Sequence, residues 1–391
     1  MTNGLGWNGM RRNRARCGLA AGIAATVAIL PSAGVAQAMS NGTPVTDPNT
    51  AQWVATIDPV GTGSLFDTAE CGGALIGPDR VVTAGHCVAD VDPHRMRIHL
   101  DARVLSKDPG IERGVRGIVV APGYTVLPTP IDPAVGSASA RNDLAMILLD
   151  KPVTGVPVLP IAPSRPAPGT TVSLFAHGNT GKIVGFEDPD YRDDTLHRGD
   201  LTVVSKADCA AGTPATVDAK SVMCAQDTAT RSVGACWRDS GSPAVTYRAG
   251  RAELAGLFSF GGETLGKPCS PTIAAFADAT AFQDWLLGSP GAFEPFPTDK
   301  PVVRRVNGSL HCDLPQWDPV RGRRPTSTSV GWSTLSWMGT LPVMTPIPGA
   351  DSADIPNADV AQRKADVVCV VTATNFGGRI QTWSDAVHIA V

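Results

Sequence analysis

The stretch Ala235-Cys236-Trp237-Arg238-Asp239-Ser240-Gly241-Ser242-Pro243-Ala244 decides how the rest of this chain is interpreted. A Ser-Gly pair alone is typical of a turn. Two stretches upstream change that interpretation: residues 81–87 contain His86 and residues 141–149 contain Asp143. A serine hydroxyl becomes a good nucleophile when a base takes its proton and a third group orients that base. Histidine and a buried carboxylate suit these two roles.

These three motifs resemble those of trypsin-like serine proteases, which have the chymotrypsin fold. His86, Asp143 and Ser240 fall on the family's three catalytic motifs in the order His, Asp, Ser, which differs from the order in subtilisins and α/β-hydrolases. The resemblance covers residues 39–287 and implies an all-β fold of two six-stranded β-barrels. It also implies peptide-bond hydrolysis with Ser240 as nucleophile, His86 as base and Asp143 as orienting group, and it implies no cofactor.

The first 38 residues have the pattern of a signal peptide. Four arginines between positions 11 and 16 precede an apolar run over residues 18–30, and Ala36-Gln37-Ala38 matches a small-x-small cleavage site. The apolar run is short for a membrane span. We therefore expect a secreted protein with no stable membrane anchor after signal removal, and an N-terminal anchor is the alternative.

The resemblance also gives the new N-terminus a role. In the family this terminus pairs with the aspartate before the catalytic serine, so Met39 and Asp239 are predicted partners. Signal removal would then be the activating step. The alternative is a disordered start of the mature chain.

Export favours disulfide bonds. The chain has nine cysteines, and eight remain once Cys17 leaves with the signal peptide. An even number in an exported chain is typical of a disulfide framework, although spacing does not fix the pairing. The resemblance implies the pairs Cys71–Cys87, Cys209–Cys224 and Cys236–Cys269, which leaves Cys312 and Cys369 for each other. Metal ligation is the alternative, but the sequence has no Cys-x-x-Cys spacing and no metal site is predicted.

Composition limits the class of protein. Hydrophobic residues make up 43% and charged residues 18%, so we expect a packed core rather than a disordered chain. The formal net charge is -3, and no basic block lies beyond the N-terminus. This argues against a nucleic-acid partner and leaves a protein or peptide substrate as the expected one.

Short apolar segments with β-branched residues, bounded by Gly, Pro and Asp, predict strands. They cover residues 52–57, 73–76, 81–83, 96–100, 144–149, 171–177, 201–205 and 254–260. Residues 280–287 predict a helix with Phe282, Trp285 and Leu286 on one face. Residues 124–140 are rich in proline and serine and predict an inserted loop.

A second domain is predicted after residue 287. Residues 288–302 are rich in glycine and proline and predict a linker. Residues 303–391 resemble an immunoglobulin-like β-sandwich, because Cys312 and Cys369 flank three tryptophans, Trp317, Trp332 and Trp337. Val367 stands where many such domains have tyrosine. The ligand of this domain is left open between a protein and a cell-surface polymer.

The resemblance predicts that the backbone N–H groups of Arg238 and Ser240 form an oxyanion hole. The family almost always has glycine in place of Arg238, since glycine takes conformations that other residues resist. If the peptide at Arg238 turns away, one donor is lost, which lowers turnover about 10²–10³-fold. If it stays, the arginine charge is expected to cover the mouth of the specificity pocket.

The remaining predicted residues contact substrate. Gly234 corresponds to the floor of the specificity pocket, where trypsins have aspartate, so we expect no preference for Arg or Lys. Ser259, Phe260 and Gly261 resemble the segment beside the substrate backbone, and Ser259 is expected to hydrogen-bond the Asp143 carboxylate. Thr272 falls on a pocket wall.

The sequence therefore predicts a secreted serine endopeptidase. The alternative is a catalytically impaired homologue that acts as a protein- or surface-binding module, and the arginine in the oxyanion loop motivates it.

Overall fold

The regular secondary structure of the described residues consists mainly of antiparallel strands, and the helices are short. The computed structural model describes residues 39–59, 63–127, 139–179, 192, 194–213, 215–261, 269, 272–288, 293–319, 324–338, 341–363 and 365–388. The predicted signal peptide, residues 128–138 of the predicted insertion and residues 289–292 of the predicted linker lie outside this part of the chain. Residues 36–391 form one compact unit.

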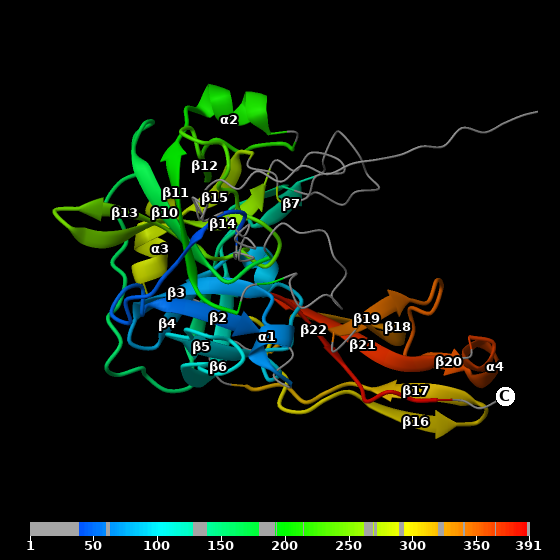
Figure 1. Ribbon diagram of the computed structural model, residues 1–391. Coiled ribbons are helices and arrows are strands. Elements are labelled where there is room, and N and C mark those ends of the chain that lie inside the picture. Colours follow the sequence, from blue (N-terminus) through cyan, green and yellow to red (C-terminus); the bar gives the residue numbers. More distant parts are fainter. Residues whose placement is uncertain are drawn as a thin grey trace, which may run out of the picture. The chain divides into compact units, whose positions relative to one another are not determined.

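The first barrel is a closed ring in the order β2-β3-β4-β9-β6-β5. Figure 1 shows β2, β3, β4, β5 and β6 lying together. Its strands are β2 (Val54–Asp58), β3 (Cys71–Gly77), β4 (Arg80–Thr83), β5 (Arg97–Leu100), β6 (Ile111–Val120) and β9 (Ala145–Leu149). All five residues of the apolar strand β9 are buried. Strands β4 and β9 are antiparallel, with Thr83 opposite Ala145. The residues that follow β4 and those that precede β9 therefore lie at the same end of the barrel.

The second barrel is closed by the pairing of β11 with β12, in the order β11-β10-β13-β14-β15-β12. Its strands are β10 (Thr171–Ala176), β11 (His197–Val203), β12 (Val222–Gln226), β13 (Pro243–Arg248), β14 (Arg251–Gly261) and β15 (Ala274–Asp278). The two-residue strand β1 (Thr43–Pro44) pairs with the edge of β11. Two closed six-stranded barrels confirm the predicted fold class.

The remaining elements of this part are short. Helix α1 (Leu65–Thr68) and the 3-10 helix η1 (Gly85–Cys87) belong to the first barrel, and α2 (Lys206–Gly212) belongs to the second. The predicted terminal helix is present as η3 (Ala279–Phe282) followed by α3 (Gln283–Leu287), with Leu286 fully buried. The two ends of the predicted insertion pair as strands β7 (Thr125–Leu127) and β8 (Ser139–Arg141), which the sequence did not predict.

The C-terminal sandwich, residues 302–388, consists of two sheets. One contains β16 (Val302–Val306), β17 (Ser309–Asp313) and β20 (Asp354–Pro356), and α4 (Asn357–Ala361) follows it. The other contains β18 (Ser327–Met338), β19 (Leu341–Pro346), β21 (Asp366–Asn375) and β22 (Gly378–Trp383).

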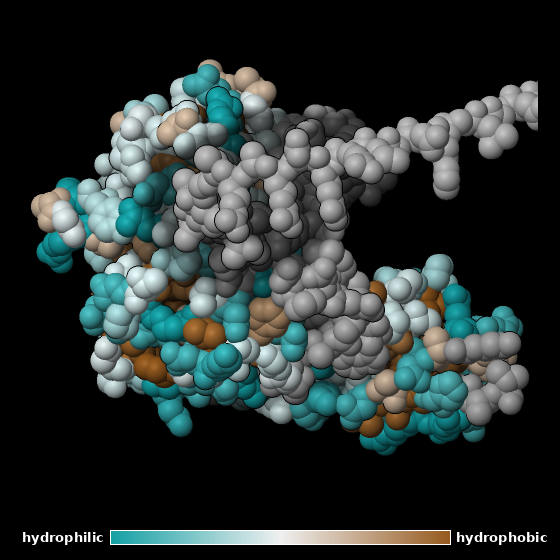
Figure 2. Space-filling view, viewed as in Figure 1, coloured by the Kyte–Doolittle hydropathy of each residue, from teal (hydrophilic) through white to brown (hydrophobic). Residues whose placement is uncertain are grey.

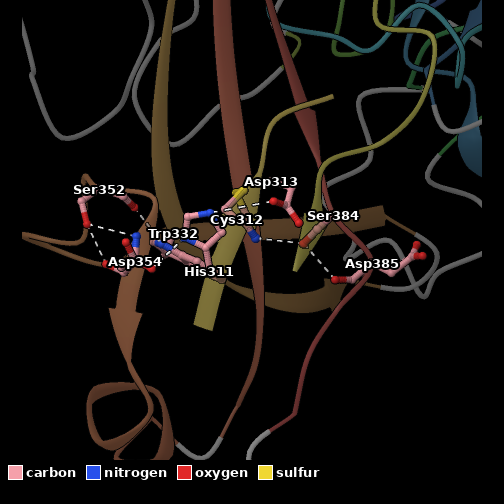
Figure 3. The surroundings of a disulfide bond; sticks show 9 residues. His311, Cys312, Asp313, Trp332, Ser352, Asp354, Ser384 and Asp385 are labelled. Atoms are coloured by element: carbon pink, nitrogen blue, oxygen red, sulfur yellow. Dashed lines mark hydrogen bonds and ion pairs between the residues drawn. A yellow bond between two sulfur atoms is a disulfide. The ribbon is translucent and has the colours of Figure 1, made fainter. Parts of the chain in front are cut away.

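A disulfide between Cys312 on β17 and Cys369 on β21 joins the two sheets of the sandwich. Trp332 packs in the same apolar core, is 1% exposed, and donates from Nε1 to the Ser352 carbonyl at 3.0 Å (Figure 3). The backbone N–H of Cys369 donates to Ser384 Oγ at 3.0 Å. Trp332 and this disulfide therefore share the apolar core between the two sheets.

The predicted linker is partly packed. Phe293 is 4% exposed and belongs to an apolar cluster with Val119, Met146 and Leu148 of the first barrel. The next residue, Glu294, donates its backbone N–H to the Ile118 carbonyl at 3.0 Å. Composition predicted a linker here, and the Phe293 side chain in this apolar cluster fixes part of it.

The surface drawn in Figure 2 is mainly hydrophilic, and its hydrophobic residues form small separate groups. Among the described residues, no helix combines the length and the apolar character that crossing a membrane requires.

Candidate active site

His86 and Asp143 meet at one end of the first barrel. His86 lies in η1, directly after β4, and Asp143 lies just before β9, so the pairing of these two strands brings the residues together. The disulfide Cys71–Cys87 ties the residue after His86 to β3. His86 Nδ1 is 2.7 Å from Asp143 Oδ2, and the His86 backbone N–H donates to Asp143 Oδ1 at 2.8 Å. These contacts fix the imidazole, whose other ring nitrogen, Nε2, lies 3.8 Å from Cys87 Sγ.

Ser259 gives Asp143 a further donor. Its Oγ lies 2.5 Å from Asp143 Oδ2, as the sequence predicted. Asp143 is 1% exposed, and a buried carboxylate is stable when hydrogen bonds and an opposite charge satisfy it. Burial raises the pKa of Asp143, but the His86 charge and the hydrogen bonds from His86 and Ser259 outweigh burial and lower this pKa.

The same pair changes the pKa of the imidazole. Burial lowers the pKa of His86, but the Asp143 charge and hydrogen bond outweigh it and raise the pKa above its ordinary value. The imidazole side chain is 34% exposed and its partner 1%, so one side of the pair is open to a substrate.

The Ser240 turn lies against the same end of the first barrel. The Gly72 N–H donates to the Ser240 carbonyl and the Gly241 N–H to the Phe258 carbonyl, each at 2.7 Å. Gly241 has a φ of +75°, and a Cβ there would lie 2.3 Å from Thr83 Oγ1, so only glycine allows this approach. Among the described residues, no hydrogen bond joins Ser240 Oγ to His86 Nε2. Such bonds are often long in free enzymes and tighten when substrate binds.

Arg238 has the backbone conformation of a glycine. Its φ is +68°, in the left-handed region. The carbonyl of the preceding residue, Trp237, accepts a hydrogen bond from the Asn179 N–H at 2.8 Å. Because the N–H and C=O of a trans peptide point in opposite directions, the Arg238 N–H faces away from Asn179. Trp237 itself is 53% exposed.

The Arg238 side chain is buried, with 4% of it exposed, so the expectation that its charge covers the pocket mouth is wrong. Its Nη2 lies 2.9 Å from Glu70 Oε1, and its Nη1 donates to the Asp67 carbonyl at 3.3 Å. Burial raises the pKa of Glu70 even though the Arg238 charge opposes this. Sequence reasoning missed Glu70, because 168 positions separate it from Arg238 and no local pattern marks it.

Asp239 is fully buried behind the Ser240 turn. Its carboxylate accepts hydrogen bonds from the N–H groups of Cys236 at 2.7 Å and Gly178 at 2.9 Å. Burial nevertheless raises the pKa of Asp239 to about 7. A Cβ at Gly178 would lie 2.0 Å from Asp239 Oδ1, so a glycine is required there.

The first residues after the predicted cleavage site are also buried. Met39 is 0% exposed and packs in the apolar cluster of the second barrel. Ser40 pairs with Gly234 through two backbone hydrogen bonds, from Ser40 N–H at 2.9 Å and from Gly234 N–H at 3.2 Å. The predicted pocket floor and the predicted mature N-terminus therefore lie side by side.

The other predicted pocket residues lie on or near β14. Phe260 is 8% exposed and packs with Cys209, Cys224 and Ile273. A Cβ at Gly261 would have only Phe258 within 4 Å, at 3.8 Å, so this position is open. Thr272 is half-buried just before β15.

The four disulfides are Cys71–Cys87, Cys209–Cys224, Cys236–Cys269 and Cys312–Cys369, the pairs that the sequence analysis gave. In the described part of the chain, the one group spaced to hold a metal is Cys71, His86 and Cys87. Two of its three ligand atoms are the sulfurs of a disulfide, which leaves the histidine nitrogen as a ligand.

Comparisons with known proteins find relatives of the part of the chain that forms the two barrels. The family model described as Trypsin matches residues 40–286. The chain is 24% identical to trypsin iota of Drosophila melanogaster over 57% of this chain and 79% of that protein. It is 27% identical to a trypsin of Saccharopolyspora erythraea over 56% of this chain and 85% of that protein.

Not all relatives have names that denote enzymes. The inactive CLIP domain-containing serine protease A3 of Aedes aegypti is 27% identical to this chain over 61% of its residues. The match spans about half (48%) of the length of that relative. Among solved structures, neuropsin, a serine protease expressed in the limbic system of mouse brain, matches with a TM-score of 0.48 and 21% identity, over 63% of this chain and 97% of that one. The family model covers more than half of the sequence, and the chain therefore belongs to the trypsin family.

Proposed function

We propose that this protein is a secreted serine endopeptidase. The observation that carries the proposal is the Asp143 carboxylate, buried and hydrogen-bonded by both His86 and Ser259 beside the turn that contains Ser240. A histidine with only a structural role needs neither a buried carboxylate partner that accepts two side-chain hydrogen bonds nor an imidazole edge that is open to solvent.

The proposed reaction has two half-reactions. Ser240 Oγ attacks the substrate carbonyl carbon while His86 Nε2 takes the hydroxyl proton, and Asp143 stabilises the imidazolium. The N–H groups of Arg238 and Ser240 hold the oxyanion of the tetrahedral intermediate. His86 then gives its proton to the leaving amine as the peptide bond breaks, which leaves an acyl-enzyme. Water repeats the sequence with His86 as base, which releases the acid and restores the serine.

The proposed layout is a signal peptide over residues 1–38, a protease domain over 39–287, a linker over 288–302 and an immunoglobulin-like domain over 303–391. The competing function is that of a binding module without activity, and it is motivated by relatives that are named as inactive. The contacts of Asp143 favour the enzyme.

A fluorophosphonate probe tests this proposal. We expect the mature protein to react covalently, with the label on the peptide that contains Ser240, as located by mass spectrometry. Failure to label at neutral pH, in a sample that unfolds cooperatively, would support the binding module.

Pocket chemistry gives a specificity prediction. Gly234 brings no charge to the pocket floor, and its backbone is occupied by Ser40. We expect small or medium apolar side chains to be preferred before the cleaved bond. A peptide library scored by mass spectrometry checks this, and strict cleavage after Lys or Arg would contradict it.

Glu70→Gln is expected to lower turnover about tenfold, because it removes the acidic partner of a buried guanidinium in the oxyanion loop. The added change Arg238→Gly should restore turnover, since glycine takes the φ of +68° without an ion pair. Steady-state hydrolysis of one peptide measures both variants.

The matched control is Glu253→Gln, which removes the partner of Arg248 in an exposed ion pair. Such pairs contribute little, so turnover should not change. If Glu70→Gln behaves like this control, the Arg238–Glu70 pair does not support the oxyanion loop.

Signal removal is proposed to activate the enzyme, with the α-ammonium of Met39 pairing with Asp239. Support comes from the burial of Met39 and from a buried carboxyl whose pKa is about 7. We expect N-terminal sequencing of the secreted protein to begin at Met39. Ala38→Leu should block this cleavage and leave the protein unreactive to the probe, whereas Gln37→Ala should not. A mature chain that begins far from Met39 would contradict the pairing.

A further inference from the structure

The segment after the predicted catalytic histidine contacts the C-terminal sandwich. Asp90 follows η1 by three residues, and both its carboxylate oxygens face Arg379 of β22. Arg379 Nε is 2.5 Å from Asp90 Oδ1, and its Nη2 is 3.1 Å from Oδ2. The Asp90 N–H also donates to the Arg379 carbonyl at 3.2 Å. A two-pronged arginine–carboxylate pair fixes orientation as well as distance.

A second contact, two residues further along, is buried. Thr382 Oγ1 donates to Asp92 Oδ2 at 2.7 Å, and the two residues are 0% and 4% exposed. Next to it, the Arg95 guanidinium lies over the Trp383 ring, 4.3 Å from its centre. A hydrogen bond to a charged group is worth more than a neutral one, and more still away from water.

Two glycines at the turn between β21 and β22 pack where a side chain would have no space. A Cβ at Gly377 would lie 2.1 Å from the backbone carbon of Phe293, and one at Gly378 would lie 2.4 Å from Glu294 Oε1. Asn375 Nδ2 donates to the Phe293 carbonyl at 2.8 Å. The sandwich therefore contacts the packed part of the linker as well as the histidine segment, residues 86–92.

The contact reaches His86 through short backbone links. The N–H groups of Val88 and Ala89 both donate to the Gly85 carbonyl, at 3.2 and 2.9 Å, so a displacement at Asp90 passes into η1. Asp90 itself has a φ of +68°, a conformation that needs support from its surroundings. A Cβ at Gly85 would lie 3.2 Å from Asp143 Oδ1, so η1 has little room to shift without disturbing the carboxylate.

We propose that the C-terminal sandwich holds the histidine segment in its working position through Asp90 and Asp92, so that Arg379 and Thr382 are positioning residues of the protease site. This inference rests on the proposed function. It assigns the sandwich a role in the same molecule in addition to any external ligand, and it makes catalysis depend on a hairpin nearly 300 positions from His86, since 289 positions separate Asp90 from Arg379.

Arg379→Ala and Thr382→Val in the full-length mature chain test it. We expect each to lower the rate of fluorophosphonate labelling of Ser240 and the kcat of peptide hydrolysis about tenfold, with KM little changed. Arg379→Lys should recover part of the rate, because lysine keeps the charge but not the two-pronged geometry. Asp90→Asn combined with Arg379→Ala should be no slower than either change alone.

Arg304→Ala is the matched control. It breaks an exposed ion pair with Asp313 inside the sandwich, and should leave the labelling rate unchanged. An equal loss in Arg304→Ala would mean that general weakening of the sandwich, not the contact with Asp90, slows the enzyme, and would overturn the inference.

Hydrogen–deuterium exchange separates this inference from the proposed function. Backbone amides of residues 86–92 should exchange faster in Arg379→Ala than in the parent and in Arg304→Ala. If the parent is not labelled by the probe but exchange accelerates, the endopeptidase proposal fails and the structural contact stands. If exchange over residues 86–92 is unchanged, the positioning role is overturned whatever the activity.

Discussion

Replacing Ser240 by alanine is expected to lower peptide hydrolysis about 10⁶-fold and to abolish fluorophosphonate labelling. The variant keeps the fold, because Ser240 is held through its backbone carbonyl, which accepts from the Gly72 N–H. Loss of the Oγ atom removes the nucleophile, and the Ser259 hydroxyl beside Asp143 already donates its proton to that carboxylate. Progress curves at high enzyme concentration, with thermal unfolding as a check on the fold, measure the effect.

Ser329→Ala is the control for this change. Ser329 is exposed on β18 of the sandwich, so its loss should alter neither labelling nor turnover. If Ser240→Ala retains more than a small fraction of the activity, Ser240 is not the nucleophile and the acyl-enzyme route is wrong.

Asp143→Asn is expected to lower kcat about 10⁴-fold at neutral pH. An amide keeps the size of the carboxylate, but presents a donor where His86 Nδ1–H needs an acceptor, so the imidazole is held in the wrong tautomer. The change also removes the charge that raises the pKa of His86. A general base works when it is neutral, so the raised pKa makes the parent lose activity as the pH falls through a value above 6.5, the ordinary value for His86.

The pH profile of kcat/KM tests this assignment. Its acidic limb should lie above pH 6.5 in the parent and move to lower pH in Asp143→Asn, because the variant's imidazole no longer gains from a neighbouring negative charge. Ser259→Ala should move the acidic limb less than Asp143→Asn does, since it removes one hydrogen bond to Asp143 and keeps the charge. If the acidic limb does not move in Asp143→Asn, the Asp143 charge does not set the pKa of the catalytic base.

The fold followed from the sequence because its motifs are local. The segment around His86, the buried strand after Asp143 and the Ser240 turn each have a signature of ten residues or fewer, and the cysteines add long-range pairing once the family is recognised. Strand β6 was missed since charged residues and glycines interrupt its apolar pattern. Strands β12, β13 and β15 were also not predicted.

The contacts between distant segments could not be predicted. Glu70 has no feature that marks it as the partner of Arg238, and the effect of an arginine in the oxyanion loop depends on that partner. In the same way, the pairing of Asp90 with Arg379 joins two residues from separately predicted regions, each of which reads as an ordinary surface charge. Such pairs are set by three-dimensional packing, for which a single sequence carries no periodic signal.

The buried carboxyl group of Glu294 has a consequence for storage and working conditions. Both of its oxygens are buried without a hydrogen-bond partner among the described residues, and burial, together with the nearby Asp90, raises the pKa of Glu294 well above its ordinary value. The folded chain therefore retains a proton that the unfolded chain releases, so this group weakens folding progressively as the medium becomes more alkaline. Glu294 lies against Gly378 of the sandwich. Alkaline solutions should therefore loosen the contact between the sandwich and the segment that contains Glu294, and mildly acidic solutions should preserve it.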